Sequence, residues 1–262
     1  MLDNPGLRIL QNNLHKQKER TYGILNDPDI KDFTMLMIQE QYWSNYTKSS
    51  LTHHAWILYE PMGTASDEQQ PRSVIYVNKK SFTAAQITQL LIPSADITAI
   101  QAKLQGASKP SLFINIYNPS DNSALPALQR YFQQNPPHHY ELIIMAGDFN
   151  CHHPMWNPPR YSRHDEEADK LVEIATELGL NLLIPPGTVT FPNAETAIDL
   201  VWANEMASAR MMKCGVAQVH DHGSDHLPIE TWLIGEIQKL PELPSFNYNK
   251  TDWEKFKEIL QQ

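Results

Sequence analysis

The chain has 262 residues, 41% of them hydrophobic, and a formal net charge of −9 at pH 7. That length and apolar content fit one large core, so we expect a single α/β domain followed by a tail. The negative charge excludes broad, non-specific attraction to a polyanion, because phosphate binding normally rests on lysine and arginine displacing counterions.

The N-terminal segment has no basic stretch followed by an apolar one, and no apolar run approaches the ~18 residues that a membrane span needs. We therefore expect a soluble, intracellular protein with no membrane partner. Its two cysteines, Cys151 and Cys214, suit a reducing compartment, and no disulfide is expected.

Contact with nucleic acid has to be local in so acidic a chain. Two sources of positive charge are available for it: a divalent cation held by some of the carboxylates, and small basic groups. These groups are Lys16, Lys18 and Arg20, then Lys79 and Lys80, and finally Arg160 with Arg163. Taken singly, each group also fits a solvated surface of mixed charge.

Short apolar or alternating runs predict ten strands. In chain order they are residues 7–14, 34–40, 55–60, 72–79, 97–104, 111–118, 141–148, 197–204, 211–219 and 228–234. Helical spacing of apolar residues predicts helices at 16–25, at 123–132 and, most clearly, from Asp165 to Gly179. Ten strands are too many for one small sheet, so we predict two sheets packed face to face with helices outside.

The composition changes near Leu240, where prolines and polar residues precede a short amphipathic segment beginning at Trp253. We therefore divide the chain into a domain at 1–236 and a linker or tail at 237–262.

Polar residues suited to metal and proton chemistry lie at or near the ends of the predicted strands. They are Glu40, Tyr117, Asn118, Asp148, Asn150, Asp199, Asp225 and His226. A run such as "IIMAGD" also fits a buried strand entering a simple turn, but that interpretation does not explain why the pattern recurs. Strand ends that gather at one rim of a sheet can direct such groups into one cleft.

These residue types indicate phosphate chemistry. Carboxylate and amide oxygens are hard ligands that suit Mg²⁺ or Mn²⁺, usually together with substrate phosphate. The adjacent pair Asp225 and His226, with Asp199 available, also supplies a carboxylate that can orient and stabilise an imidazolium.

The ordered set of motifs resembles the endonuclease/exonuclease/phosphatase superfamily over residues 7 to 234. The motifs are "LQNNL", "IQE", "IYNPS", "AGDFNCHH", "AIDLVWAN" and "GSDHLPI". Within that superfamily the chain is most similar to the endonuclease domain of fungal-type non-LTR retrotransposons. The resemblance implies an α/β four-layer sandwich of two packed, mostly antiparallel sheets flanked by helices.

The resemblance also implies roles for individual residues. The metal ligands would be Asn13, Glu40 and Asp225. The catalytic residues would be Tyr117 on the phosphate, Asp148 on the attacking water, Asn150 on the phosphoryl oxygens, and Asp199 orienting His226.

Other residues are expected to line the site. The resemblance places Thr190 and Ser224 there, and Thr196 stands where the family usually has serine. We interpret His153 as a group on the substrate side. The turn at 191–196 lies in a region whose loops help choose the target in the resembling enzymes.

The resemblance implies a Mg²⁺-dependent endonuclease, with Mn²⁺ as a substitute, that nicks double-stranded DNA and leaves a 3′-hydroxyl and a 5′-phosphate. Such a nick primes reverse transcription at the target, so the partners would be DNA and a covalently linked reverse transcriptase. The location would be nuclear during action on chromosomal DNA.

Three alternatives stay open. One is a phosphatase or phosphodiesterase of the same superfamily acting on a small phosphoester, which the acidic charge favours. The second is an inactive binding module. The third is a zinc hydrolase, because "HDHGSDH" at 220–226 resembles an H-x-H-x-D-H pattern with one residue too many. We expect His220 and His222 to be exposed instead, and Trp156 to be a core residue or a DNA contact.

Overall fold

The computed structural model describes residues 6–62, 70–217, 220–235 and 253–260. The linker expected from residue 237 lies outside the described residues as far as 252, so that part of the domain division stays an expectation. The amphipathic segment beyond it is the helix α5 (Trp253–Leu260). Among the described helices, none is long and apolar enough to cross a bilayer.

The first large sheet has six strands in the order β13-β14-β1-β2-β6-β5. Their bounds are β1 Leu7–Asn13, β2 Met35–Gln39, β5 Trp56–Tyr59, β6 Ser73–Asn78, β13 Met211–Val216 and β14 Ile229–Leu233. The second large sheet has the order β11-β12-β10-β9-β8-β7. Its strands are β7 Ile87–Gln89, β8 Ile97–Ala102, β9 Ser111–Tyr117, β10 Ile143–Asp148, β11 Leu180–Leu182 and β12 Asp199–Asn204.

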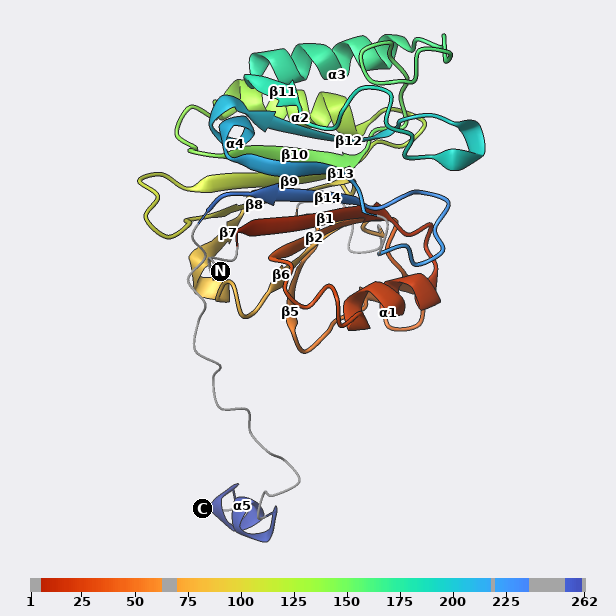
Figure 1. The fold of residues 1–262 in the computed structure, drawn as a ribbon. Coiled ribbons are helices and arrows are strands. Elements are labelled where there is room, and N and C mark those ends of the chain that lie inside the picture. The colour runs from red at the N-terminus through yellow and green to blue at the C-terminus, as the bar shows by residue number, and fades with distance from the viewer. Residues whose placement is uncertain (1–5, 63–69, 218–219, 236–252, 261–262) are drawn as a thin grey trace.

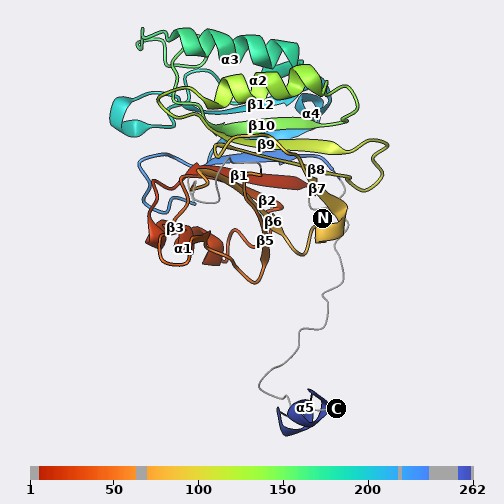
Figure 2. The same ribbon diagram turned by 180° about the vertical axis from the view of Figure 1, so that it is seen from behind.

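The two sheets pack face to face, with β1 and β2 against β9 and β10 (Figure 1). The helices α2 (Ala124–Gln134) and α3 (Glu166–Glu177) cover the outer face of the second sheet, and α1 (Lys18–Asn26) lies below the first sheet, as both views show (Figures 1 and 2). A short helix, α4 (Glu205–Ala209), follows β12. The predicted four-layer α/β sandwich is confirmed.

Alternation along the strands separates two cores. In β1, Leu7 and Ile9 belong to the large cluster between the sheets, whereas Leu10 belongs to a smaller cluster under α1. This is the two-residue period of a strand that is buried on both faces. Ile24 of α1 is a buried member of the smaller cluster.

Most strand pairs are antiparallel, as predicted, and the exceptions position the site. In the first sheet β1 and β2 are parallel, and in the second β9 and β10 are parallel. The register pairs Asp148 with Tyr117 on one side and with Asp199 of the antiparallel β12 on the other. Three predicted site residues from distant segments therefore lie at one level of the second sheet.

All ten predicted strands and all three predicted helices are present. The elements that periodicity did not predict have two to five residues: β3 Trp43–Ser44, β4 Ser49–Ser50, β7, β11, α4 and the 3-10 helices η1 (Ala84–Gln86) and η2 (Pro192–Ala194). Elements of this length do not complete enough periods to give a pattern.

Candidate active site

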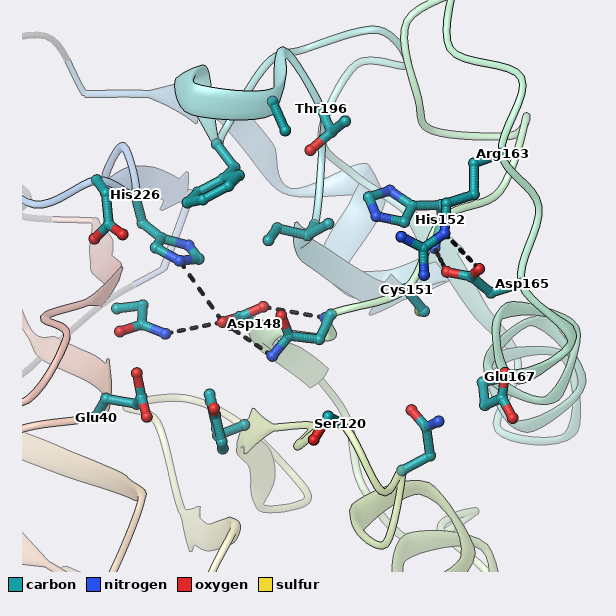
Figure 3. A pocket seen from close by; sticks show the side chains of 18 of the residues that line it. Glu40, Ser120, Asp148, Cys151, His152, Arg163, Asp165, Glu167, Thr196 and His226 are labelled. Carbon is teal, nitrogen blue, oxygen red and sulfur yellow. Dashed lines mark hydrogen bonds and ion pairs between the residues drawn. The ribbon is translucent and has the colours of Figure 1, made fainter.

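A pocket of about 610 Å³ opens where the two sheets end at the same rim (Figure 3). Eight of the twelve predicted site residues line it: Asn13, Glu40, Tyr117, Asp148, Asn150, Thr196, Asp225 and His226. They come from both sheets and from the loops that follow them, as the strand-end pattern predicted.

Asp148 lies at the floor of the pocket and is 1% exposed. The preceding Gly147 lets β10 approach β9, because a Cβ at this position would lie 1.9 Å from the carbonyl oxygen of Ile116. The Asn13 Nδ2 donates to Asp148 Oδ2 at 2.8 Å, and the Asn150 backbone N–H donates to Asp148 Oδ1 at 3.1 Å. The carboxylate is therefore fixed by two partners.

Asn150 turns the chain away from the strand with a φ of +48°. Asparagine tolerates this left-handed conformation better than most residues. Its Nδ2 donates to the carbonyl oxygen of Asn118 at 2.9 Å, so its side chain is held beside Asp148.

His226 faces Asp148 from the opposite wall and is oriented by Asp199. Its Nδ1 lies 2.9 Å from Asp199 Oδ2, and its Nε2 lies 4.0 Å from Asp148 Oδ2. Asp199 has no exposed surface, and its Oδ1 accepts a hydrogen bond from Gln11 Nε2 at 3.1 Å. This network directs Nδ1 to Asp199 and leaves Nε2 to the pocket.

The charges of the pair follow from burial and from their neighbours. Burial alone lowers the pKa of His226, but Asp199, with Asp148 and Asp225, outweighs it and raises this pKa to about 9. Burial, with repulsion from Asp199, raises the pKa of Asp148 to about 7 although His226 opposes it. At slightly alkaline pH the imidazole is thus protonated and the Asp148 carboxylate is largely ionised.

Glu40 and Tyr117 form a second part of the wall. Glu40 has a φ of +46°, an uncommon conformation for this residue type and one that is concentrated at functional sites. Tyr117 lines the pocket together with Glu40. Burial, with the negative charges of Glu40 and Asp148, raises the pKa of Tyr117 well above its ordinary range, so the phenol stays protonated.

Asp225 lies at the mouth of the pocket beside His15 and Arg20. Its Oδ2 is 3.1 Å from His15 Nδ1, and its Oδ1 is 3.7 Å from Arg20. Burial works to raise the pKa of Asp225, but a backbone hydrogen bond and the charges of His15 and His226 lower it below the ordinary value. Asp225 therefore remains an anion at neutral pH.

These donors fit a divalent cation. Glu40, Asp148 and Asp225 offer carboxylate oxygens and Asn13 offers an amide, which is the hard-oxygen set preferred by Mg²⁺. The raised pKa of Asp148 shows that its buried negative charge is incompletely compensated by the protein.

Four predicted site residues lie outside the pocket lining. Thr190 is buried behind Asp199 and accepts its backbone N–H at 3.1 Å. Ser224 donates to the carbonyl oxygen of Asn13 at 2.6 Å. Both residues therefore hold the site from behind, as Asp199 does.

His153 is the fourth of these residues. It packs against Trp156 and lies near His164 and Asp169, outside the pocket lining. Its neighbour His152 lines the pocket instead. Which of two adjacent histidines faces inward depends on the loop conformation, which the sequence pattern does not encode.

Two expectations about other residues are wrong. His220 is only 5% exposed and packs edge-on against Phe33, and the His222 side chain is 15% exposed. Both imidazoles lie near Asp27 at the end of α1; His220 is buried and His222 is partly buried. Trp156 has no exposed surface, which confirms it as a core residue and excludes the DNA contact.

The loop after β10 adds residues that the sequence patterns did not place in the site: Cys151, His152, Tyr161, Arg163 and Asp165. Gln11, which fixes Asp199, was also missed. A signal for Gln11 exists in the sequence, because Gln11, Asn12 and Asn13 form a polar run inside an apolar strand and all three are buried.

Comparisons with known proteins agree with this architecture. Residues 111–230 match the family described as endonuclease-reverse transcriptase. A search of curated proteins finds no significant match.

Solved structures of similar fold include the endonuclease domain of TRAS1, a telomere-specific non-LTR retrotransposon. It is 18% identical with a TM-score of 0.69, and the alignment covers 88% of this chain and 99% of that one. The AP endonuclease LMAP of Leishmania major is 12% identical with a TM-score of 0.64, covering 87% of each chain. The catalytic domain of Xenopus laevis APE2 is 12% identical with a TM-score of 0.63, covering 91% of this chain and 95% of that one.

The matched segment contains β9, β10 and β12 with Tyr117, Asp148, Asp199 and His226, and the whole sandwich has the fold of these enzymes. The chain therefore has the fold of solved endonuclease/exonuclease/phosphatase proteins, and its residues 111–230 match the endonuclease-reverse transcriptase family.

Proposed function

We propose that the protein is a divalent-metal-dependent endonuclease that nicks double-stranded DNA by hydrolysing a phosphodiester. The observation that carries the proposal is the pair at the pocket floor: Asp148 Oδ2 lies 4.0 Å from the Nε2 of a protonated His226, which Asp199 orients. A carboxylate that can accept a proton therefore lies beside a cation that can stabilise an anion, and both groups line the pocket.

Each residue has a defined part in the proposed reaction. Asp148, held by Asn13 and Asn150, positions a water molecule and accepts its proton. The His226 Nε2–H and the Asn150 amide donate to the phosphoryl oxygens as charge develops on them. Tyr117 offers its hydroxyl to the same phosphate.

The metal ligands would be Glu40, Asp225 and Asn13, and a bound Mg²⁺, or Mn²⁺ in its place, supplies electrostatic stabilisation of the phosphoryl oxygens. In-line attack forms a bond from the water oxygen to phosphorus and breaks the bond to the 3′ oxygen. The products are a 5′-phosphate and a 3′-hydroxyl.

DNA as the substrate is supported by the matched family and by neighbours of similar fold, which include a retrotransposon endonuclease domain and two AP endonucleases. We further propose that the domain serves a non-LTR retrotransposon of the fungal type and acts in the nucleus. The segment after residue 236 would lead towards a reverse transcriptase that uses the new 3′-hydroxyl.

A second candidate is a phosphoesterase acting on a small substrate. The pocket lining favours it in one respect, because five carboxylates face the cavity and repel a polyanion: Glu40, Asp148, Asp165, Glu167 and Asp225. An inactive binding module is disfavoured by the unbroken set of catalytic side chains in the pocket.

The test is nicking of supercoiled plasmid in Mg²⁺, with EDTA and the Asp148→Ala variant as controls. We expect nicking that requires the metal and Asp148. Turnover of a small phosphoester without any nicking would identify the phosphoesterase, and absence of both activities would support the binding module.

A further inference from the structure

The pocket extends beyond the reacting groups to a second end that has its own chemistry. Figure 3 shows His226 and Glu40 on one side of Asp148, and His152, Arg163 and Asp165 on the other side. The second end is built by the loop between β10 and α3, which runs from 151 to 165. We call its three residues His152, Tyr161 and Arg163 the outer cluster.

Arg163 differs from the other pocket residues in charge. Among the described residues that line the pocket it is the one lysine or arginine, and it shares the lining with the five carboxylates named above. Its side chain is 60% exposed, so a ligand in the pocket can reach it. Lys16 and Arg20 lie at the other end but pair with Glu40 and Asp225, so Arg163 is the cation that lines the cavity itself.

The guanidinium is held in place from one side. Arg163 Nε donates to Asp165 Oδ1 at 2.8 Å, while Asp165 Oδ2 accepts the His152 backbone N–H at 3.0 Å. Asp165 also donates its own backbone N–H to the carbonyl oxygen of His152 at 2.9 Å. Asp165 thus fixes Arg163 against the segment that follows Asp148. Asp165 accepts only the Nε–H of the guanidinium, so the terminal N–H groups can donate to a ligand.

The two other members supply neutral hydrogen-bonding groups. The rings of His152 and Tyr161 lie 4.8 Å apart, with the hydroxyl 3.5 Å from His152 Nε2. Tyr161 also interacts with the Arg163 guanidinium. Burial, followed by the charge of Arg163, lowers the pKa of His152, so its imidazole is neutral at pH 7.

We propose that the outer cluster binds the DNA phosphate next to the scissile one, with Arg163 as the positioning residue. This inference rests on the proposed endonuclease function. Guanidinium groups recognise phosphate oxygens through paired N–H donors, and contacts to phosphates fix the register of a strand without reading its sequence. Arg163 thereby holds the strand so that the next phosphate lies at Asp148.

The chain offers a matched control for Arg163. Arg160 lies in the same loop, is exposed, and does not line the pocket. Arg163→Ala and Arg160→Ala remove the same charge from the same loop. Any difference between them therefore reports the position of Arg163 rather than the net charge of the protein.

The first measurement is binding to a short DNA duplex, followed by fluorescence anisotropy in Ca²⁺ at several salt concentrations. We expect Arg163→Ala to weaken binding about tenfold and to reduce the slope of log affinity against log salt by about 0.9, as loss of one phosphate contact requires. Arg160→Ala should change affinity less than about twofold, and Arg163→Lys should recover part of the loss.

The second measurement separates this inference from the proposed function. With plasmid DNA in Mg²⁺, Arg163→Ala should raise KM about tenfold while kcat changes by less than about threefold. On bis(p-nitrophenyl) phosphate, which has a single phosphate, Arg163→Ala should reduce kcat/KM by only a small fraction of the reduction seen on DNA.

Equal effects of Arg163→Ala and Arg160→Ala on binding would overturn the proposal that the outer cluster binds a phosphate. The proposed endonuclease function would be unaffected. Equal losses on DNA and on the single-phosphate ester would place Arg163 at the reacting centre or in the fold, and would also overturn it. A wild-type protein that binds DNA through Arg163 without nicking it would overturn the proposed function and keep the phosphate contact.

Discussion

Two histidines on one loop, His222 and His226, each lie beside an aspartate from another part of the chain, yet they have opposite charge states. His226 is bonded to Asp199 at 2.9 Å and has a pKa raised to about 9. His222 lies 3.3 Å from Asp27, but burial, against the opposing effect of Asp27, lowers its pKa below 6.5. The proximity of one carboxylate therefore does not decide whether a buried imidazole is charged.

The difference lies in the number and geometry of the neighbours. His226 has a direct hydrogen bond to Asp199 and the further charges of Asp148 and Asp225. His222 shares Asp27 with His220, whose charge opposes its protonation. Asp27 and Asp221 raise the pKa of His222, but burial lowers it more, and its Nε2 has no hydrogen-bond partner among the described residues. Burial favours the neutral form of histidine unless several carboxylates outweigh it.

His226 and His222 also have different positions and roles on the same loop. His226 faces the pocket, whereas His222 packs so closely on α1 that a Cβ at Gly23 would lie 3.2 Å from its Nδ1. We infer that the group of Asp27, His220 and His222 anchors the loop that carries Asp225 and His226.

The largest effect expected is on catalysis at His226. His226→Ala should lower the rate of plasmid nicking by about a thousandfold or more, because it removes the cation facing Asp148. His222→Ala, the matched variant on the same loop, should change the rate by less than about threefold. Similar losses in the two variants would erase the distinction between a reacting and an anchoring histidine.

The next effect concerns the charged partner of His226. Activity needs the protonated imidazole, so the rate should fall as pH rises through about 9. Asp199→Asn removes the main cause that raises this pKa, so the alkaline fall should move to lower pH, with a rate loss of about a hundredfold. The measurement is a pH–rate profile, and an alkaline limb that stays in place would remove Asp199 from the mechanism.

A smaller effect is expected on stability, with opposite signs for the two groups. The raised pKa of His226 contributes stability below pH 6.5 that is lost as pH rises through about 9. The lowered pKa of His222 contributes stability above pH 6.5 that is lost as pH falls through its folded-state value.

Urea unfolding of wild type and His222→Ala at pH 7.5 and pH 5 tests the second sign. The substitution should cost about 1–2 kcal/mol at pH 7.5, because a buried side chain is lost, and less at pH 5. A cost that grows on acidification would mean that His222 is charged in the folded protein.

The smallest effect is expected for Asp27→Asn. The amide oxygen can still accept the Asp29 backbone N–H, which Asp27 Oδ1 accepts at 2.8 Å, so the turn after α1 is kept. We expect a change in unfolding free energy below about 1 kcal/mol and unaltered nicking. A loss of nicking like that of His226→Ala would show that the anchoring group takes part in the reaction.

The sequence predicted the strands and the strand-end residues for one physical reason. A buried strand can be recognised locally by its apolar run, and Asp148 and Tyr117 lie at the ends of such runs. Parallel pairing of β9 and β10 then brings the two residues level. The metal and catalytic assignments came from resemblance, and the structure places those residues around one pocket.

What the sequence did not predict depends on contacts between distant segments. His220 and His222 were expected to be exposed, because burial against Asp27 arises from α1, nearly two hundred positions earlier in the chain. The inward direction of His152 and Arg163 depends on the loop that Asp165 fixes. No local period encodes either arrangement.

The polarity of the nick tests the central claim most directly. Attack by water near Asp148 with departure of the 3′ oxygen leaves a 3′-hydroxyl, which a polymerase can extend and which ligase can join to the 5′-phosphate. Plasmid nicked by the wild-type protein should therefore be extended and resealed without prior treatment. Nicks that resist both enzymes until a 3′-phosphate is removed would contradict the proposed mechanism and the retrotransposon role together.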